Sequence, residues 1–287
     1  MNKGICIIAT GHPVYGGWAM NLCMSIKVTD PHAKVALLYK GAAANHIIPY
    51  KYIFDHWIEI PDEMLQSNGM ESLIRPKVCL YDLTPFDETI FIDADVVMFP
   101  TKKVTELFDT LKDQEFVIGT RGIANESDRF KWTSIEKLKE QYKYEGDVYN
   151  ISSEFMYFKK GKVAKKIFSE AKKAFDKPNV NYIRFGNGVP DELAFQIAFM
   201  KTGHKAYKET FLPFYWAHLE ENRKPHVQQH DLYKLQFYGY SMGGNSQHTH
   251  TMDIYNNIAK WCASKFGLPS HYPMRNKREV LQTRHTI

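Results

Sequence analysis

Apolar and polar segments succeed one another along the chain in a pattern that predicts alternating strands and helices. Apolar runs rich in Val and Ile predict strands at 4–10, 34–41, 54–61, 89–99, 115–122 and 153–161, with further strands within 204–244. Helical spacing of apolar residues predicts helices at 18–30, 77–83, 104–113, 162–175 and 191–203, and the segment 11–17 reads as a loop. Such alternation is typical of an α/β protein with a mostly parallel central sheet and helices on both faces.

The length of 287 residues, without an internal repeat or linker, predicts a single domain. Apolar runs stay well short of the ~20 residues of a membrane helix, and glycines interrupt the short apolar start, so we expect neither a membrane span nor a signal peptide. Four cysteines lie far apart without a Cys-x-x-Cys pair, which predicts buried thiols in a reducing compartment. A cytoplasmic protein is therefore expected.

The charge of the chain is mildly basic. Hydrophobic residues make up 44% and charged residues 24%, as in ordinary globular proteins, while the formal net charge is +5. Cations gather at the C-terminus, which fits an anionic partner such as phosphate groups, nucleic acid or an acidic membrane surface. A solvated tail explains the same pattern equally well, so charge alone does not identify a partner.

Two carboxylates interrupt the apolar stretch "TIFIDADVVMFP", Thr89–Pro100. Residues two apart on a strand point to the same face, so Asp93 and Asp95 are expected side by side at the edge of a core. Buried carboxylates are costly unless they are paired, bind a metal or lie at a strand end. Such a pair suits a hard divalent cation, Mn²⁺ or Mg²⁺, which holds phosphate groups as further ligands. An alternative is that the pair caps a turn or binds Arg or Lys.

The stretch "RPKVCLYDLTPFDETIFIDADVVMF", Arg75–Phe99, resembles the family 8 nucleotide-sugar glycosyltransferases, which include glycogenin and bacterial galactosyltransferases. In that family a Lys precedes the D-x-D strand at this separation, and here Lys77, Asp93 and Asp95 match. The resemblance implies a GT-A fold with a Rossmann-like sheet. It also implies a nucleotide-binding half at 1–100, which ends in D-x-D, and an acceptor-binding half at 101–287.

Other segments match the family in chain order. "IIATGHPVYGGWAMNLCMSI" is similar to its uridine-binding start, and "NISSEFMYFKKG" to its N-x-G-x-F-x-Y strand, with Ser153 in place of Gly. "GVPDELAFQIAF" is similar to its Asp-Gln segment, with Asp191 matching and Glu192 in place of Gln. The His that the family uses as third metal ligand falls on His248, or less favourably on His250 or His218.

The resemblance implies a retaining, metal-dependent transferase that uses a UDP-sugar and Mn²⁺ or Mg²⁺. Asp191 would orient the acceptor or the sugar hydroxyls, and Lys77 would place a charge near the phosphates. The glycines of "SMGGN" would let backbone N–H groups approach a diphosphate. We thus predict donor contacts from residues in six segments: Ala9, Thr10, Gly11, Tyr15, Lys77, Asp93, Ala94, Asp95, Ser152, Ser153, Gly243 and Gly244.

The acceptor stays open at the level of sequence. A glycan, a lipid-linked sugar, a protein side chain, a small molecule and a hydroxymethylated base in DNA are all compatible with it. The net positive charge of the chain, and the aromatic residues interspersed with charged ones in 124–147, are compatible with a nucleic-acid acceptor. A catalytically silent nucleotide-sugar binder is a second hypothesis, and a metal-dependent phosphodiesterase a third. The sugar and the oligomeric state are not indicated.

Overall fold

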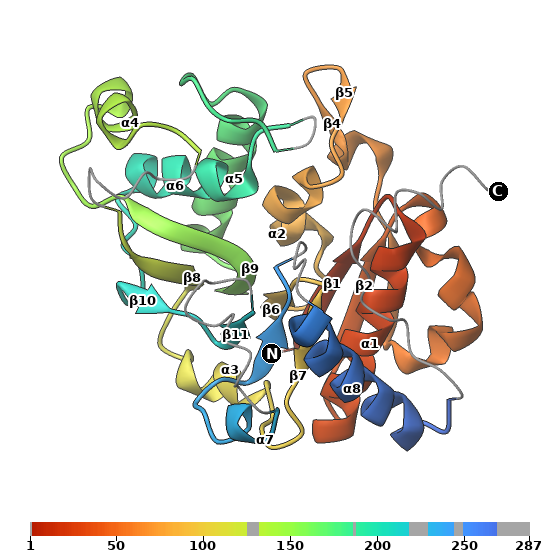
Figure 1. Cartoon of the computed structure of the whole chain (residues 1–287). Coiled ribbons are helices and arrows are strands. Elements are labelled where there is room, and N and C mark those ends of the chain that lie inside the picture. The colour runs from red at the N-terminus through yellow and green to blue at the C-terminus, as the bar shows by residue number, and fades with distance from the viewer. Residues whose placement is uncertain (1, 125–131, 186–187, 218–228, 244–248, 269–287) are drawn as a thin grey trace. The chain divides into compact units, whose positions relative to one another are not determined.

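The computed structural model describes residues 2–124, 132–185, 188–217, 229–243 and 249–268 (Figure 1). Its strands are β1 (Lys3–Ala9), β2 (Val35–Tyr39), β3 (His56–Glu59), β4 (Gln66–Ser67), β5 (Met70–Glu71), β6 (Glu88–Ile92), β7 (Val96–Met98), β8 (Phe116–Ile123), β9 (Tyr149–Lys159), β10 (Thr210–Phe211), β11 (Phe214–Trp216) and β12 (Gly239–Ser241). Its α-helices are α1 (Pro13–Thr29), α2 (Leu80–Leu83), α3 (Glu106–Thr110), α4 (Ile135–Tyr142), α5 (Lys162–Asp176), α6 (Asp191–Thr202), α7 (Gln229–Leu232) and α8 (Thr249–Lys265). Short 3₁₀ helices are η1 (Gly41–Ile53), η2 (Asp62–Met64) and η3 (Arg75–Cys79).

Two compact units alternate along the chain. The first contains Met1–Ile8, Ile58–Ile92 and Leu111–Leu212. The second contains Ala9–Trp57, Asp93–Thr110 and Pro213–Ile287. Each unit is therefore assembled from separate stretches, and neither coincides with a half of the sequence.

The first unit is built on a mixed sheet in which β10, β8, β9, β6 and β1 follow one another. β1 and β6 are parallel, with Ile5 opposite Ile90, whereas β6–β9, β8–β9 and β10–β8 are antiparallel. Irregular register between β8 and β9 begins at Gly119, where an added Cβ would come within 2.6 Å of the Ser152 carbonyl. The absence of a side chain thus lets two strands approach closely beside the candidate site.

Helices α5 and α6 lie against the sheet of the first unit, near β8 and β9 (Figure 1). Phe116 of β8 packs edge-on against Phe168 of α5 and against Phe199 of α6, at centroid distances of 5.6 and 5.9 Å. These rings are all buried. Complete burial of such a side chain contributes roughly 1.5–3 kcal/mol. This aromatic core fixes α6 through its last turn, and Asp191 is the first residue of the same helix.

The second unit is organised around α1, which is buried from Gly16 to Ile26 and packs on β7, η1 and α8. A helix that is apolar on all sides needs neighbours on all sides. Polar contacts fix this packing, because the Met98 N–H of β7 donates to the Ser25 hydroxyl of α1 at 2.9 Å. β12 joins β11 in parallel and β7 antiparallel in a separate small sheet.

The α/β class and most of the expected elements are confirmed, while some local predictions were wrong. The apolar run 89–99 is two strands, because the chain turns at Asp93–Asp95 between β6 and β7. The expected loop 11–17 is mostly the first turns of α1, which begins at Pro13. Proline is favoured there because the first helical N–H has no partner within a helix. Helix α8 was not predicted.

Among the described residues, no helix has both the length and the apolar character that crossing a membrane requires. The four cysteines are buried and free of disulfides. Burial raises the pKa of Cys6 and of Cys262 to about 12, so these thiols stay protonated near neutral pH. They are structural residues rather than nucleophiles.

Candidate functional site

The first unit brings three predicted site residues together, and we call them the Asp191 cluster: Lys77, Ser153 and Asp191. The Ser153 hydroxyl donates to Asp191 Oδ2 at 2.6 Å, and Lys77 Nζ lies 3.3 Å from the same oxygen. The side chains of Asp191 and Lys77 are only 9% and 16% exposed. A buried carboxylate is tolerated because it has a cation and a hydrogen-bond donor.

Each member of the Asp191 cluster comes from a different element. Asp191 is the first residue of α6, directly after Pro190, where the helix dipole favours a negative charge. Ser153 lies on β9 and Lys77 on η3, whose ammonium also sits 5.7 Å from the centre of the Phe91 ring on β6. The expected helix at 77–83 is in fact η3 followed by α2. This change does not remove Lys77 from the cluster.

The two serines of β9 have different surroundings. Ser153 is bonded to Asp191, so its hydroxyl orients that carboxylate. Ser152 is 1% exposed, and its buried Oγ has no hydrogen-bond partner among the described residues. Both were predicted to contact the donor, and that role stays a prediction for each.

A further polar contact, which the sequence did not reveal, adjoins the Asp191 cluster. The Trp132 indole N–H donates to Glu192 Oε2 at 2.6 Å. Glu192 follows Asp191 in α6, so the contact ties the chain before α4 to the residue next to the buried carboxylate. Sixty positions separate the two partners, and neither one's local pattern indicates the other.

The second unit holds Asp93 and Asp95 on one turn, here named the carboxylate turn (93–95). Both residues are half-exposed, whereas Ala94 between them is 5% exposed. The Val96 N–H donates to the Asp93 carbonyl at 3.3 Å, which closes the turn. Two carboxylates thus lie at a strand end, as expected, although on a turn rather than along a strand.

A glycine-containing segment lies beside the carboxylate turn. The Met242 N–H donates to the Asp95 carbonyl at 3.2 Å, directly after β12. Gly243 has a φ of 58°, and its N–H donates to the Ser241 hydroxyl at 3.2 Å. Glycine adopts this left-handed conformation without strain. The backbone at Gly243 is therefore held next to the carboxylates, while Gly244 lies outside the described residues.

The chain between β1 and α1 carries the other residues predicted to contact a nucleotide. Ala9 and Thr10 are buried, and Gly11 adopts a φ of 76°. His12 Nδ1 accepts from the Val14 N–H at 3.1 Å and so caps α1. Tyr15 is 39% exposed, and its ring meets Trp18 edge-on at 5.3 Å. An exposed aromatic ring whose position is fixed by contact with a neighbouring ring is a suitable surface for stacking a base.

Two buried polar groups support the second unit behind the carboxylate turn. Asn21 of α1 donates from Nδ2 to the Tyr255 hydroxyl of α8 at 3.4 Å. Burial raises the pKa of Tyr255 far above its usual range; the Asn21 hydrogen bond opposes that rise, and the charge of Asp95 adds to it. Sequence reasoning missed both Asn21 and Tyr255.

The donor chemistry of the carboxylate turn fits a hard divalent cation in part. Two half-exposed carboxylates supply oxygen ligands, and a diphosphate would supply more. Among the described residues, no group of three His, Cys, Asp or Glu side chains could hold a metal ion. His218 and His248 lie outside the described residues, as does the side chain of His250. The predicted third ligand therefore stays a prediction.

Comparison with solved structures identifies the fold. The bifunctional glycosyltransferase WbbM in its apo form matches with a TM-score of 0.59 and 11% identity, over 93% of this chain and 51% of that one. The galactosyltransferase LgtC, in complex with donor and acceptor sugar analogues, matches with a TM-score of 0.55 and 12% identity, over 88% of this chain and 95% of that one.

The chain has a glycosyltransferase fold of the GT-A type. It spans about half the length of the WbbM chain and nearly the whole of the LgtC chain. No protein-family model matches the sequence, and a comparison with curated proteins finds no match. At 11% and 12% identity these likenesses establish the fold, and activity has to be argued from the residues.

Proposed function

We propose that the protein transfers a sugar from a nucleotide-sugar donor, a UDP-sugar, to an acceptor hydroxyl in a metal-dependent reaction that retains anomeric configuration. One observation carries the proposal: in a GT-A fold, the turn that follows β6 presents two half-exposed carboxylates. The LgtC structure of the same fold contains donor and acceptor sugar analogues. The Asp191 cluster, in which a buried carboxylate is held by Lys77 and Ser153, supports the same proposal.

In the second unit, Asp93 and Asp95 would hold Mn²⁺ or Mg²⁺. Such an ion, when bound with a sugar nucleotide, neutralises the charge that develops on the leaving diphosphate. The backbone N–H groups around Gly243 would face phosphate oxygens, which glycine permits because it has no side chain. Tyr15 offers its exposed ring to the base. These roles use features that lie within one unit.

In the first unit, Asp191 would accept hydrogen bonds from hydroxyl groups of the transferred sugar or of the acceptor. Lys77 and Ser153 hold this carboxylate in one orientation. Lys77 would in addition provide a positive charge for phosphate. A group fixed in advance loses little entropy when the reactants bind.

For a retaining reaction we favour attack on the face from which the diphosphate leaves. The bond between the anomeric carbon and the phosphate oxygen breaks, and the acceptor oxygen forms the new bond to that carbon. The proton of the acceptor hydroxyl passes to the departing phosphate oxygen. No enzymic nucleophile is needed in this scheme, and Asp191 acts by orientation.

The test is calorimetric titration of UDP with and without Mn²⁺, on the wild type and on Asp95→Ala. We expect binding that requires Mn²⁺ and that weakens at least ~100-fold in the variant, because a ligand of the metal is removed. Asp109→Ala is a matched control, since Asp109 is an exposed carboxylate on α3 of the same unit. Equal UDP binding by wild type and Asp95→Ala would refute the assignment of the carboxylate turn.

A time course of UDP release distinguishes an active enzyme from a catalytically silent binder. The wild type is incubated with UDP-sugars and Mn²⁺, and release of UDP is followed over time. Slow hydrolysis or transfer to added acceptors is expected of an active enzyme. Tight Mn²⁺-dependent binding without any release of UDP would favour the catalytically silent alternative.

A further inference from the structure

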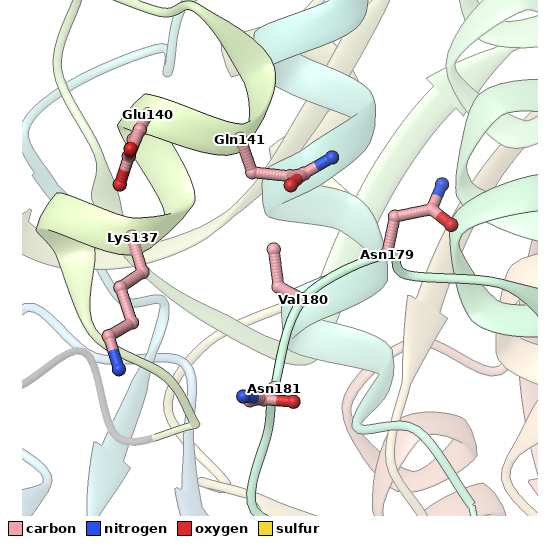
Figure 2. A pocket seen from close by; sticks show the side chains of 6 residues that line it. All are labelled: Lys137, Glu140, Gln141, Asn179, Val180 and Asn181. Carbon is pink, nitrogen blue, oxygen red and sulfur yellow. The ribbon is translucent and has the colours of Figure 1, made fainter.

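The first unit has a polar hollow of about 720 Å³ between α4 and the extended segment 179–181. Figure 2 shows its lining side chains, three from α4 and three from the facing segment: Lys137, Glu140, Gln141, Asn179, Val180 and Asn181. The hollow is open to solvent and contains one apolar side chain, Val180, among five polar ones. Its size is within the range of small-molecule sites, ~300–1,000 Å³.

The frame of this hollow is fixed by hydrogen bonds. The Thr133 hydroxyl donates to the Asn181 carbonyl at 2.6 Å, and the Ile183 N–H donates to the Trp132 carbonyl at 2.8 Å. The Tyr142 hydroxyl donates to the Pro178 carbonyl at the other end of α4. Both walls are thus tied together at each end, which holds the space between them open.

The lining side chains, in contrast, are not engaged with one another. Within the described part of the chain, the side chains of Lys137, Glu140, Gln141, Asn179 and Asn181 make no hydrogen bond or ion pair. Their polar atoms can therefore form hydrogen bonds with a ligand, which would displace the water around them. A rigid frame that presents polar groups can orient a ligand with matching hydroxyl groups.

The hollow is connected to the Asp191 cluster through the contacts of Trp132. The Trp132 indole donates to Glu192, which follows Asp191, and Thr133 bonds the wall of the hollow at Asn181. Two hydrogen bonds, together with the peptide links Trp132–Thr133 and Asp191–Glu192, therefore connect the buried carboxylate to the hollow. A ligand in the hollow and the carboxylate share this frame.

The chemistry of the lining fits a neutral carbohydrate. Amide groups of Asn and Gln donate and accept at once, as sugar hydroxyls do. The charges of Lys137 and Glu140 cancel, so the hollow lacks the surplus of cations by which proteins bind nucleic-acid phosphates. Farther along the same segment, Ile183 and Phe185 are 64% and 43% exposed and offer apolar surface to the ring face of a sugar.

We propose that this hollow is an acceptor subsite that binds sugar units of a neutral oligosaccharide. The inference rests on the proposed function, and it names the acceptor class as a glycan rather than a nucleic acid. Amide groups on both walls would read the hydroxyl pattern. The hydroxyl that receives the transferred sugar belongs to another unit of the same glycan.

The test uses the full chain, an array of immobilised neutral oligosaccharides, and the double variant Gln141→Ala/Asn181→Ala. Glu136→Ala is the control, because Glu136 is an exposed polar residue of α4 that does not line the hollow. We expect the wild type and Glu136→Ala to bind the same glycans. The double variant should bind them at least ~10-fold more weakly, since each lost hydrogen bond contributes ~1 kcal/mol.

Titration of UDP with Mn²⁺ on the same proteins separates this inference from the proposed function. Unchanged UDP binding with weakened glycan binding in the double variant supports the subsite. Glycan binding that the double variant retains overturns it, as does UDP binding by a wild type that binds no glycan on the array. Glycan binding without any UDP binding overturns the donor site, and with it the acceptor role.

A salt series with a short DNA duplex addresses the alternative acceptor. Duplex binding that falls steeply with salt and is lost in the double variant would identify the hollow as a nucleic-acid surface and overturn the inference. As a final check, the glycan found on the array serves as acceptor in a transfer assay. Its KM should rise ~10-fold in the double variant while kcat stays unchanged, because binding contacts alone are removed.

Discussion

The Asp191 cluster and the carboxylate turn use the same side chain in opposite surroundings. Asp191 is 9% exposed, faces Lys77 at 3.3 Å and accepts from Ser153 at 2.6 Å. Asp93 and Asp95 are half-exposed on a turn between two buried strands. In the first region the protein supplies the compensating charge itself. In the second, two half-buried carboxylates of like charge lie on one turn, and Asp95 Oδ1 is buried.

This difference separates an orienting carboxylate from a cation-binding pair. A buried aspartate with its own ammonium partner gains little from a metal, whose entry would have to displace Lys77. Two neighbouring carboxylates repel each other, and a divalent cation relieves that repulsion. Variants of Asp191 and of Asp95 should therefore differ in what they lose: catalysis for Asp191, and metal-dependent nucleotide binding for Asp95.

The largest effect is expected for Asp191→Asn. The amide keeps the shape and still accepts a hydrogen bond from Ser153, but it leaves the ammonium of Lys77, 16% exposed, without its anion. We expect sugar transfer to fall ~100-fold or more and the free energy of unfolding to fall by ~2–4 kcal/mol. Rates of UDP release and denaturant unfolding measure the two effects.

The comparison is sharpened by UDP titration of the same variant. Asp191→Asn should bind UDP with Mn²⁺ like the wild type, whereas Asp95→Ala should not. The double variant Lys77→Met/Asp191→Asn should recover part of the lost stability, because the cation that faced the Asp191 carboxylate is also removed. Loss of UDP binding in an Asp191→Asn protein that stays folded would contradict the assignment of nucleotide binding to the carboxylate turn and of catalysis to Asp191.

A smaller effect is expected for Ser153→Ala, with Ser152→Ala as its neighbour on the same strand. Loss of a hydrogen bond to a charged group costs ~1.5–3 kcal/mol, so Ser153→Ala should slow transfer ~10-fold and lower stability within that range. The Ser152 Oγ is buried without a partner among the described residues, so its removal should leave stability within ~0.5 kcal/mol of the wild type.

Ser153 acts through Asp191, so its role should depend on the hydroxyl that donates to the carboxylate. Ser153→Thr retains a hydroxyl and should restore part of the rate. Equal rates of sugar transfer in Ser153→Ala and Ser153→Thr would contradict a positioning role.

Much of the fold follows from local pattern. The apolar runs indicate where β1, β2, β6, β8 and β9 lie, and the sequence Pro190–Asp191 marks the start of α6. What the pattern misses is the break in the run 89–99, because Asp93 and Asp95 separate two strands that pair in different sheets. A continuous apolar run carries no sign of which partner each part will find.

The candidate site was predictable in its residues rather than in its contacts. Lys77, Ser153 and Asp191 were each singled out, yet nothing local indicates that two of them share one oxygen of the third. The Trp132–Glu192 contact joins residues sixty positions apart, and only tertiary packing brings such partners together. The hollow beside α4 belongs to the same class of features.

The smallest effect is expected for Tyr255→Phe, which tests whether the carboxylate turn also has internal support. The Tyr255 hydroxyl accepts from Asn21 at 3.4 Å, a long hydrogen bond, so its loss should cost only ~0.5–1.5 kcal/mol of unfolding free energy. Burial holds the pKa of Tyr255 far above its usual range, so the hydroxyl is neutral at every working pH. Removing it changes no charge.

For this reason Tyr255→Phe should leave the pH profile of transfer unchanged between about pH 6 and pH 9, a range well below the ordinary tyrosine pKa. Its Mn²⁺ titration is the decisive measurement. If Tyr255 helps to fix Asp95, the affinity for Mn²⁺ with UDP falls ~10-fold, as for groups that orient a metal ligand. An unchanged affinity would mean that the Tyr255 hydroxyl does not help to fix the turn, to which the Val96 and Met242 N–H groups donate hydrogen bonds.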